Sequence, residues 1–348
     1  MKSVMIHTEG RVCVEDVPMP EIKHPDDVLV RVSYSGLCGS DIPRVFSQGA
    51  HFYPITLGHE FSGRVVSVGS NISDLQYDDP VACVPLLPCF ACPECSRHYY
   101  SLCKNYQFIG SRSSGGNAEY IVVNRANLFK LPTNVPLLQG AFLEPITVGL
   151  HALNLAGGCE GKEVIVIGAG TIGLLAIQCA RVMGAKSVTA IDIQADKLDL
   201  ARKIGAMQVY NSAELSAAQI REKLHDCRFE QLILETAGTP QTVSLAIEIA
   251  GPRAQIALVG TLHHDLNLPS GTFSQILRKE LTLLGSWMNY SGPWPGKEWS
   301  QAADYFRRNE LALDPLIASI SDAEGFAADV MALEGRPMKG KIVLKMAD

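Results

Sequence analysis

The sequence lacks any long apolar run, any internal repeat and any low-complexity tract. Its longest apolar stretch lies between Glu163 and Arg181, where several glycines, Thr171 and Gln178 interrupt it. A helix that crosses a membrane needs about 20 consecutive, mostly apolar residues. The sequence therefore gives no reason to expect a membrane protein.

An excess of positive charge is also lacking. The chain has 30 Lys and Arg against 36 Asp and Glu, which gives a formal net charge of −6 and a pI near 5.9. This balance argues against a nucleic acid or an anionic membrane as the main partner, although a local basic pocket can still bind an anionic substrate. A basic segment followed by an apolar one is missing from the first residues, MKSVMIHTEG, so we expect a cytoplasmic protein.

What remains is an ordinary globular composition with one unusual cluster. Hydrophobic residues make up 47% and charged residues 19% of the 348 positions, and this length suggests two domains. Of the 10 cysteines, several crowd into one short segment. Such crowding indicates metal binding in a reducing compartment rather than a disulfide scaffold.

The crowded cysteines are Cys89, Cys92, Cys95 and Cys103. Two-residue spacers let thiolates converge on one ion, and a fourth thiolate closes a tetrahedron, so the spacing predicts a structural zinc site. An iron–sulfur cluster is the first alternative, but the last gap is longer than in the bacterial ferredoxin motif, and Lys104 stands where that motif has proline. A nucleic-acid-binding zinc knuckle is the second, and the charge and the lack of a basic, aromatic flank disfavour it.

A second set of metal-ligating residues lies between Gly36 and Glu60. Cys38 and His59 are ligand types that suit Zn²⁺, and Glu60 adds an oxygen beside them. Three ligands with an open position describe a catalytic zinc, whereas a buried thiol next to an unrelated surface histidine is the alternative. Glu144, in an apolar helical segment before Pro145, is costly to bury unless it is paired or metal-bound; the alternative is an exposed carboxylate at a helix end.

The first half of the chain predicts short strands, and the second half predicts alternating strands and helices. Segments rich in β-branched residues and separated by Pro and Gly, from Met1 to Val32 and beyond, indicate a β-rich domain resembling a distorted barrel. From Glu163 onward the α/β alternation predicts a doubly wound parallel sheet. A helix around Lys297–Arg308, another near Asp322–Leu333 and a final strand, GKIVLK, suggest that the tail rejoins the first domain.

A nucleotide site is predicted where this alternation begins. The buried strand EVIVIG is followed directly by GAGTIG, from Gly168 to Gly173, and then by a helix, so backbone N–H groups can face a pyrophosphate. Asp192 ends the next strand, about twenty residues on, where a carboxylate can accept both ribose hydroxyls. Its charge would repel a 2′-phosphate and Ile193 offers no cation, so NAD is favoured over NADP.

These motifs, taken together, resemble the zinc-dependent medium-chain dehydrogenase/reductase family over the whole chain. They are, in order, GLCGSD, GHEFSG, the four cysteines, EPITVGLHA, GAGTIG and AID. Glu144 in a LEP context resembles the polyol dehydrogenase branch, because alcohol dehydrogenases of the family usually carry a cysteine there. More narrowly, five strings resemble enzymes that act on sugar alcohol phosphates: PITLGHEFSG, VPLLPCFACPEC, FIGSR, LILETAGTPQTV and GSWMNYSGPWPG.

The resemblance implies an α/β fold with two domains. A GroES-like β-rich catalytic domain would comprise residues 1–152 and 288–348, and a Rossmann NAD-binding domain with a doubly wound parallel sheet would comprise residues 153–287. It also implies two Zn²⁺ ions per subunit, NAD as cofactor, a cytoplasmic location and a homo-oligomer, either dimer or tetramer.

The resemblance also implies roles for individual residues. Cys38, His59 and Glu144 would hold the catalytic zinc, with Glu60 beside it as an occasional ligand or through a water. Asp41 would orient His59 and Ser40 would take the substrate proton, although ordinary turn chemistry is an alternative for both. The residues expected to bind the cofactor are Gly168, Gly170, Ile172, Gly173, Asp192 and Lys197.

The function that the resemblance implies is NAD-dependent, zinc-assisted oxidation of galactitol 1-phosphate to tagatose 6-phosphate. A phosphate needs a cationic clamp, for which Arg44, Arg112 and Lys297 are candidates by neighbourhood. Pro43 stands where many relatives have a histidine that transfers the substrate proton to solvent. In this chain, Glu60 with a water molecule, or His51, would have to transfer that proton.

Two other functions stay open on the sequence. One is oxidation of an unphosphorylated polyol of the sorbitol or xylitol type, or of a threonine- or butanediol-type alcohol. The other is a non-catalytic NAD-sensing protein, which the joint presence of Cys38, Ser40, His59 and Glu144 disfavours.

Overall fold

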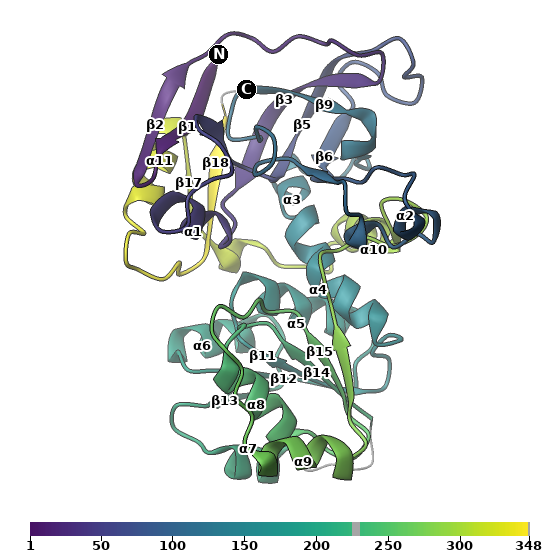
Figure 1. Ribbon diagram of the computed structural model, residues 1–348, viewed down its shortest axis with the longest axis vertical. Helices are drawn as coiled ribbons and strands as arrows, with labels where there is room; N and C mark the ends of the chain where they lie inside the picture. The colour runs from purple at the N-terminus through teal and green to yellow at the C-terminus, as the bar shows by residue number, and fades with distance from the viewer. Residues whose placement is uncertain (225–229, 347–348) are drawn as a thin grey trace. The chain divides into compact units, whose positions relative to one another are not determined.

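The computed structural model of the protein describes residues 1–224 and 230–346, and its contacts divide the chain into two compact units (Figure 1). The first unit comprises Met1–Glu144, Tyr290–Arg308 and Ile317–Asp348, and the second comprises Pro145–Asn289 and Asn309–Leu316. Contacts alone define these units, so the domain ranges expected from the sequence stay a prediction.

The first unit is built mainly from short antiparallel strands. Its strands are β1 (Lys2–Thr8), β2 (Arg11–Asp16), β3 (Asp27–Gly36), β4 (Ile55–Thr56), β5 (Glu60–Val68), β6 (Pro80–Cys83), β7 (Leu86–Leu87), β8 (Gln107–Phe108), β9 (Tyr120–Asn124), β10 (Leu128–Lys130), β17 (Ile317–Ser321) and β18 (Lys341–Lys345). Its helices are α1 (Asp41–Phe46), α2 (Pro93–Ser96), η1 (Tyr100–Leu102), η2 (Arg125–Asn127), α3 (Leu137–Ala141), α10 (Lys297–Arg307) and α11 (Ala323–Met331).

The larger sheet of this unit joins the two ends of the sequence. Its strand order is β10-β6-β5-β3-β18-β17, and β9 also pairs with β3. Within it, β18 pairs antiparallel with β3, and Gly36 at the end of β3 lies opposite Glu60 at the start of β5. The tail of the chain thus returns to the first sheet, and β3 stands between β5 and β18.

A smaller sheet, β2-β1-β4, packs against elements from the tail. Alternate residues of β1, Val4 and Ile6, are buried in one core with Phe326 of α11 and Leu344 of β18. Figure 1 shows β1 and β2 in purple beside α11 and β17 in yellow. Strand alternation leaves the odd-numbered residues of β1 on the opposite face of this sheet.

The second unit is a parallel sheet with the strand order β13-β12-β11-β14-β15-β16. Its strands are β11 (Glu163–Ile167), β12 (Ser187–Asp192), β13 (Gln208–Asn211), β14 (Gln231–Glu235), β15 (Gln255–Leu258) and β16 (Thr282–Gly285). Its helices are α5 (Thr171–Val182), α6 (Ala195–Lys203), α7 (Ala217–Lys223), α8 (Pro240–Ile249), α9 (Ser270–Arg278) and η3 (Asp314–Leu316), and α4 (Leu143–Leu155) enters it from the first unit.

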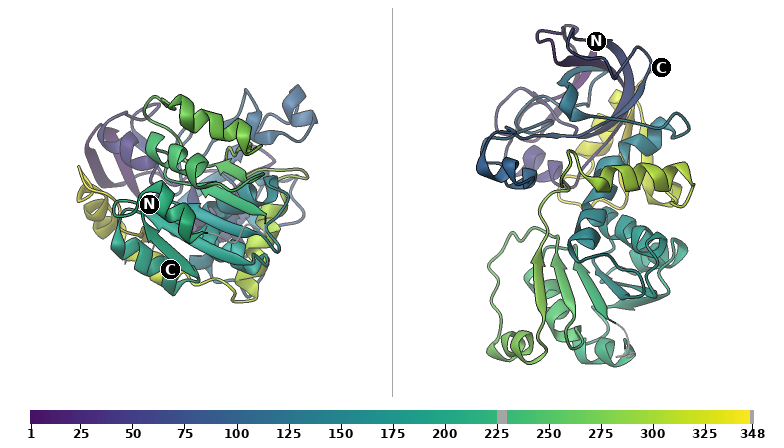
Figure 2. Two further views of the ribbon diagram at one scale, coloured as in Figure 1. Left: turned by 90° about the horizontal axis from the view of Figure 1, so that it is seen from below. Right: turned by 90° about the vertical axis from the view of Figure 1, so that its right-hand side faces the viewer.

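Helices cover both faces of this sheet (Figures 1 and 2). On one face, Ile165 and Ile167 of β11 share a core with Ile220 of α7 and Val243 of α8. The strand order reverses between β11 and β14, which is the switch point where doubly wound sheets bind ligands at the carboxyl ends of their strands. The predicted doubly wound parallel sheet is confirmed.

No helix in the described ranges has both the length and the apolar content that a membrane span requires.

Candidate active site

The four clustered cysteines meet in one place, around α2 and η1. Cys89, Cys92, Cys95 and Cys103 bring their sulfur atoms within 4.8 Å of one another. The backbone N–H of Cys89 donates to Sγ of Cys103 at 3.3 Å, and Sγ of Cys92 and Sγ of Cys95 lie 3.4 Å apart. Backbone N–H groups of Ala91 and Cys92 lower the pKa of Cys89 to about 6, so this thiol is ready to act as a thiolate ligand. The group suits one tetrahedral ion.

Cys38, His59 and Glu60 also come together, because β3 and β5 are neighbours. Cys38 follows the end of β3, His59 precedes β5 and Glu60 begins it. One ligand atom from each residue lies within 4.8 Å of the others, and His59 and Glu60 are buried. A thiolate, an imidazole and a carboxylate at this spacing can hold one Zn²⁺ ion.

The charges around His59 favour a cation in this pocket. Burial lowers the pKa of His59, but the charges of Asp41, Cys38 and Glu144 outweigh burial and raise this pKa to about 10. Nδ1 of His59 lies 3.7 Å from Oδ2 of Asp41, which is too long for a hydrogen bond. Within the described part of the chain, neither atom has a hydrogen-bond partner. The donor set is therefore rich in negative charge, and it fits a bound metal cation.

Glu144 lies at the start of α4 and is largely buried. Its charge raises the pKa of His59 and that of Tyr290, which places it near the pocket. Among the described residues, the group of ligand atoms around Cys38 and His59 contains Glu60 and not Glu144. The expected ligand role of Glu144 stays a prediction.

Glu60 forms a buried ion pair that the sequence analysis missed. Nζ of Lys341, at the start of β18, donates to Oε1 of Glu60 at 2.8 Å, to Oε2 at 2.6 Å and to the carbonyl of Leu37 at 3.1 Å. Glu60 and Lys341 are 281 positions apart in the chain, so no local pattern connects them. Lysines stand at both ends of the strand KIVLK, so no signal in the sequence singled out Lys341.

Arg44 organises the loop that carries Ser40 and Asp41. Nη1 of Arg44 donates to the carbonyl of Ser40 at 3.0 Å, to Oγ of Ser40 at 3.1 Å and to Oδ1 of Asp41 at 2.9 Å. Oγ of Ser40 donates to Sγ of Cys38 at 3.2 Å. Arg44 was a candidate for binding phosphate, but here it neutralises the wholly buried Asp41.

The other two cationic candidates are exposed. The guanidinium of Arg112 lies over the ring of Tyr106, 4.5 Å from its centroid, and Nη2 donates to the hydroxyl of Tyr106 at 3.3 Å. Lys297 begins α10. Both residues belong to the first unit.

In the second unit, a cavity of about 910 Å³ opens at the carboxyl ends of β11 and β12. Gly168, Asp192 and Lys197, three of the residues predicted to bind the cofactor, all line it. Oδ2 of Asp192 accepts a hydrogen bond from the N–H of Ala169 at 2.7 Å, and Oδ1 accepts one from Gln194 at 2.9 Å. Each oxygen keeps a lone pair that can accept a ribose hydroxyl.

The glycine loop before α5 has the geometry that its motif predicts. Gly168 has a positive φ of 99°, and a side chain at Gly173 would overlap the carbonyl of Gly168. Gly170 caps α5, no heavy atom lies within 4 Å of the place where its Cβ would stand, and Ile172 lies in the first helical turn. The N–H groups of that turn can therefore face a pyrophosphate.

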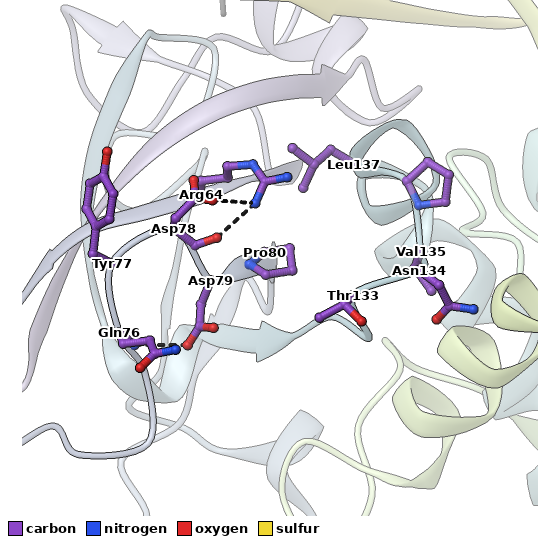
Figure 3. Close-up of a pocket in the computed structure, with 11 residues that line it drawn as sticks. Arg64, Gln76, Tyr77, Asp78, Asp79, Pro80, Thr133, Asn134, Val135 and Leu137 are labelled. Atoms are coloured by element: carbon purple, nitrogen blue, oxygen red, sulfur yellow. Dashed lines mark hydrogen bonds and ion pairs between the residues drawn. The ribbon is translucent and has the colours of Figure 1, made fainter.

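A further pocket, of about 460 Å³, lies apart from the predicted residues in the first unit (Figure 3). Its one arginine, Arg64, donates to the carbonyl of Asp78 at 2.8 Å and to Oδ2 of Asp78 at 3.2 Å. The N–H of Gln76 donates to Oδ2 of Asp79 at 2.9 Å. Since Asp78 already pairs the cation, we assign this pocket no part in binding phosphate.

Comparisons with known proteins agree with this picture. The family model for the alcohol dehydrogenase GroES-like domain matches residues 24–133, and the model for zinc-binding dehydrogenase matches residues 171–307. The chain is 62% identical to galactitol 1-phosphate 5-dehydrogenase of Escherichia coli K12, with 99% of each chain covered. It is 31% identical to D-xylulose reductase A of Aspergillus oryzae, covering 93% of this chain and 92% of that one.

Solved structures are similar as well. The crystal structure of galactitol-1-phosphate dehydrogenase from Escherichia coli has a TM-score of 0.98 and 62% identity, covering 99% of this chain and 100% of that one. An alcohol dehydrogenase from Escherichia coli CFT073 complexed with NADH has a TM-score of 0.86 and 26% identity, covering 99% of each chain.

These matches confirm the predicted combination of a GroES-like domain with a Rossmann fold. The predicted zinc and nicotinamide dinucleotide cofactors are confirmed at the level of the family, and so is the prediction of an oxidoreductase. With a relative 62% identical over nearly its whole length, the chain belongs to the zinc-binding dehydrogenase family with a GroES-like domain.

Proposed function

We propose that this oxidoreductase oxidises a secondary hydroxyl of galactitol 1-phosphate with NAD⁺, forming tagatose 6-phosphate and NADH. The observation that carries the proposal is 62% identity to galactitol 1-phosphate 5-dehydrogenase over 99% of both chains. The pocket of Cys38, His59 and Ser40 supports it, because it holds metal-ligating groups and a hydroxyl within a few ångströms of one another.

The catalytic roles follow from the contacts around that pocket. When bound, zinc supplies a Lewis acid that polarises the substrate hydroxyl, and the nicotinamide accepts the hydride. We assign Cys38, His59 and Glu144 as the ligands, since Lys341 holds both carboxylate oxygens of Glu60. Asp41 stabilises positive charge on or beside His59 through its charge rather than through a hydrogen bond.

Ser40 is proposed to receive the substrate proton. Its Oγ donates to Sγ of Cys38 and accepts from Arg44, so both its position and its lone pairs are constrained. Arg44 also ties Ser40 to Asp41, and the loop therefore behaves as one unit. The four clustered cysteines are assigned to the second, structural zinc.

The cofactor proposal is NAD rather than NADP. Asp192 lines the cavity of the second unit with a carboxylate, and Ile193 beside it offers no cation for a 2′-phosphate. Lys197 lines the same cavity and can bind a ribose hydroxyl. The loop of Gly168, Gly170 and Gly173, with Ile172, would bind the pyrophosphate.

We propose that Arg112 is the cationic residue that contacts the substrate phosphate. Arg44 is engaged with Asp41 and Ser40, whereas Arg112 is exposed and stacked on Tyr106, which orients its guanidinium. Lys297 is the second candidate. An orientated guanidinium suits the bidentate recognition of phosphate.

We also propose a homo-oligomeric, cytoplasmic enzyme. In the described part of the chain, β16 stands at the end of the parallel sheet, and Leu283 on it is 42% exposed. An apolar, unpaired edge strand favours pairing with a second copy. The cytoplasmic location follows from the cysteine usage and stays a proposal.

The test compares initial rates of NAD⁺ reduction with galactitol 1-phosphate and with galactitol at equal concentration. A strong preference for the phosphate supports the proposal. Equal rates, or a preference for galactitol, would leave a zinc dehydrogenase of free polyols, which is the reaction class suggested by the xylulose reductase relative.

A pair of arginine variants locates the phosphate. Arg112→Leu should raise KM for galactitol 1-phosphate and leave KM for galactitol unchanged, because only the phosphate contact is lost. Arg64→Leu is the matched control, since Arg64 is also an arginine of the first unit but is paired by Asp78. An unchanged KM in Arg112→Leu would direct the search to Lys297.

A further inference from the structure

Three potential metal ligands gather outside both predicted zinc sites. They are His7 of β1 with Cys13 and Glu15 of β2. One atom from each, an imidazole nitrogen, Sγ and a carboxylate oxygen, lies within 4.8 Å of the others. The sequence analysis did not single out any of these residues, and neither the proposed catalysis nor the proposed cofactor binding uses them.

The hairpin itself brings them together. β1 and β2 pair antiparallel with Met5 opposite Cys13 and Ser3 opposite Glu15, so Cys13 and Glu15 project from one face of the sheet. The pairing shifts between Ile6 and Thr8, which lets His7 approach the same face. This is the face opposite the buried core of Val4 and Ile6.

The distances come close to those of a coordinated ion. Nε2 of His7 lies 2.8 Å from Oε1 of Glu15, and Sγ of Cys13 donates to the same oxygen at 3.3 Å. Ligand atoms bonded to one tetrahedral Zn²⁺ ion lie roughly 3.3 to 3.8 Å apart, given the usual bond lengths. The Glu15 side chain is 39% exposed, so it can move by the few tenths of an ångström that are needed.

One atom of the group lacks a hydrogen bond. Nε2 of His7 is shielded from solvent, and it has no hydrogen-bond partner among the described residues despite its short distance to Glu15. Burial, followed by the hydrogen bond to Glu15, raises the pKa of Cys13, while Arg11 lowers it. A cation in place of the thiol proton would satisfy the imidazole nitrogen and pair with the carboxylate.

We propose that His7, Cys13 and Glu15 form a third metal site, which binds one Zn²⁺ ion or another borderline divalent transition metal. Sulfur, imidazole and carboxylate donors together select that class of metal over Mg²⁺ or Ca²⁺. Binding displaces the proton of the Cys13 thiol to solvent, and the thiolate takes its place as a ligand. The fourth position belongs to water, because the His7 and Glu15 side chains are partly exposed. The ion links β1 to β2 where their register shifts.

The test adds Co²⁺ to full-length protein in which metal analysis finds two zinc ions per chain, enough for the two predicted zinc sites only. The readouts are bound cobalt, the near-ultraviolet absorption of a thiolate bound to cobalt, and any zinc released. The parent should take up one cobalt ion per chain, show the thiolate band and release no zinc. Cys13→Ser should lose the band, and His7→Gln and Glu15→Gln should lose most of the cobalt uptake.

The matched control is His264→Gln, which removes an exposed histidine of the second unit and should behave like the parent. Glu15→Gln removes a charge with little change in shape, so the test can still be interpreted from this variant if Cys13→Ser folds poorly. The proposal is overturned if the parent shows no thiolate band, if the band persists in Cys13→Ser, or if it appears only with an equal release of zinc from the other sites. Dehydrogenase activity should be the same in all of these variants.

Discussion

Replacing Lys341 with methionine should destabilise the first unit strongly. The Lys341 and Glu60 side chains are 3% and 1% exposed, and both oxygens of Glu60 accept from the ammonium group. Methionine keeps most of the apolar stem but removes the charge and the hydrogen bond to the carbonyl of Leu37. The variant therefore leaves a carboxylate buried without its cation.

The size of the effect follows from that stranded charge. Removing one partner of a buried ion pair costs about 3–5 kcal/mol, because the desolvated charge that remains is uncompensated. With a denaturant slope of about 2–3 kcal/mol per molar urea, the unfolding midpoint should fall by about 1–2.5 M. The double variant Lys341→Met/Glu60→Gln buries no charge, so it should recover roughly 1–3 kcal/mol of the loss.

The assay is urea unfolding followed by tryptophan emission, to which Trp294 and Trp299 of the first unit contribute. Lys345→Met is the matched control, because Lys345 lies on the same strand but is exposed, and its loss should change stability by no more than about 0.5 kcal/mol. Two results would refute the reasoning: equal effects of Lys341→Met and Lys345→Met, or a double variant as unstable as Lys341→Met.

The same pair predicts a pH dependence. Burial lowers the pKa of Lys341, but the charge and hydrogen bond of Glu60, together with the charges of Cys38 and Glu144, outweigh burial, and the pKa lies above the usual value of 10.5. A folded-state pKa above the unfolded one means that the contribution to stability is complete below the unfolded pKa and is lost as pH rises through the folded one. The stability gap between parent and Lys341→Met should thus stay constant near neutral pH and shrink only above about pH 10.5.

Three further substitutions test the proposed sites. Asp192→Ser should raise KM for NAD⁺ by about 10- to 100-fold, because it removes charged hydrogen bonds to the ribose and one to Ala169. In steady-state kinetics, the ratio of kcat/KM for NAD⁺ to kcat/KM for NADP⁺ should fall. Cys103→Ser should lower the zinc content by one ion per chain and lower the melting temperature, as metal analysis and calorimetry can check. Glu144→Ala should leave the affinity for NAD⁺ unchanged and reduce kcat. The reduction should exceed the roughly 10- to 100-fold loss that is typical when a residue that only supports a metal ligand is removed. An unchanged kcat would show that Glu144 is not part of the catalytic site.

Local patterns in the sequence predicted the parts of the site that depend on neighbours in the chain. The spacing of the four cysteines is sufficient to bring their sulfur atoms together, because only the short helices α2 and η1 lie between the first and the last of them. The glycine motif and Asp192 were predictable for the same reason, since a strand, a tight turn and a helix fix the loop, and the next parallel strand places the carboxylate beside it.

Partners from distant parts of the chain could not be predicted in this way. Lys341 reaches Glu60 because β18 and β5 both pair with β3; the sequence analysis expected the tail to rejoin the first domain but could not tell which strand it would pair with. Arg44 was considered for phosphate binding because a charge in a loop has no visible partner in the sequence. Its three hydrogen bonds to Ser40 and Asp41 depend on how the first turn of α1 folds back on itself.

The position of β18 between β3 and β17 has a consequence for the order of events during synthesis. All the strands of the parallel sheet leave the ribosome before β18, so the second unit can fold while the first still lacks a strand. Glu60 then lacks its cation until Lys341, 281 positions further along the chain, has been synthesised. A chain that ended before β18 would still bind dinucleotide, but its metal pocket would be incomplete. Its larger sheet would also lack one strand, which would make the chain more susceptible to proteolysis.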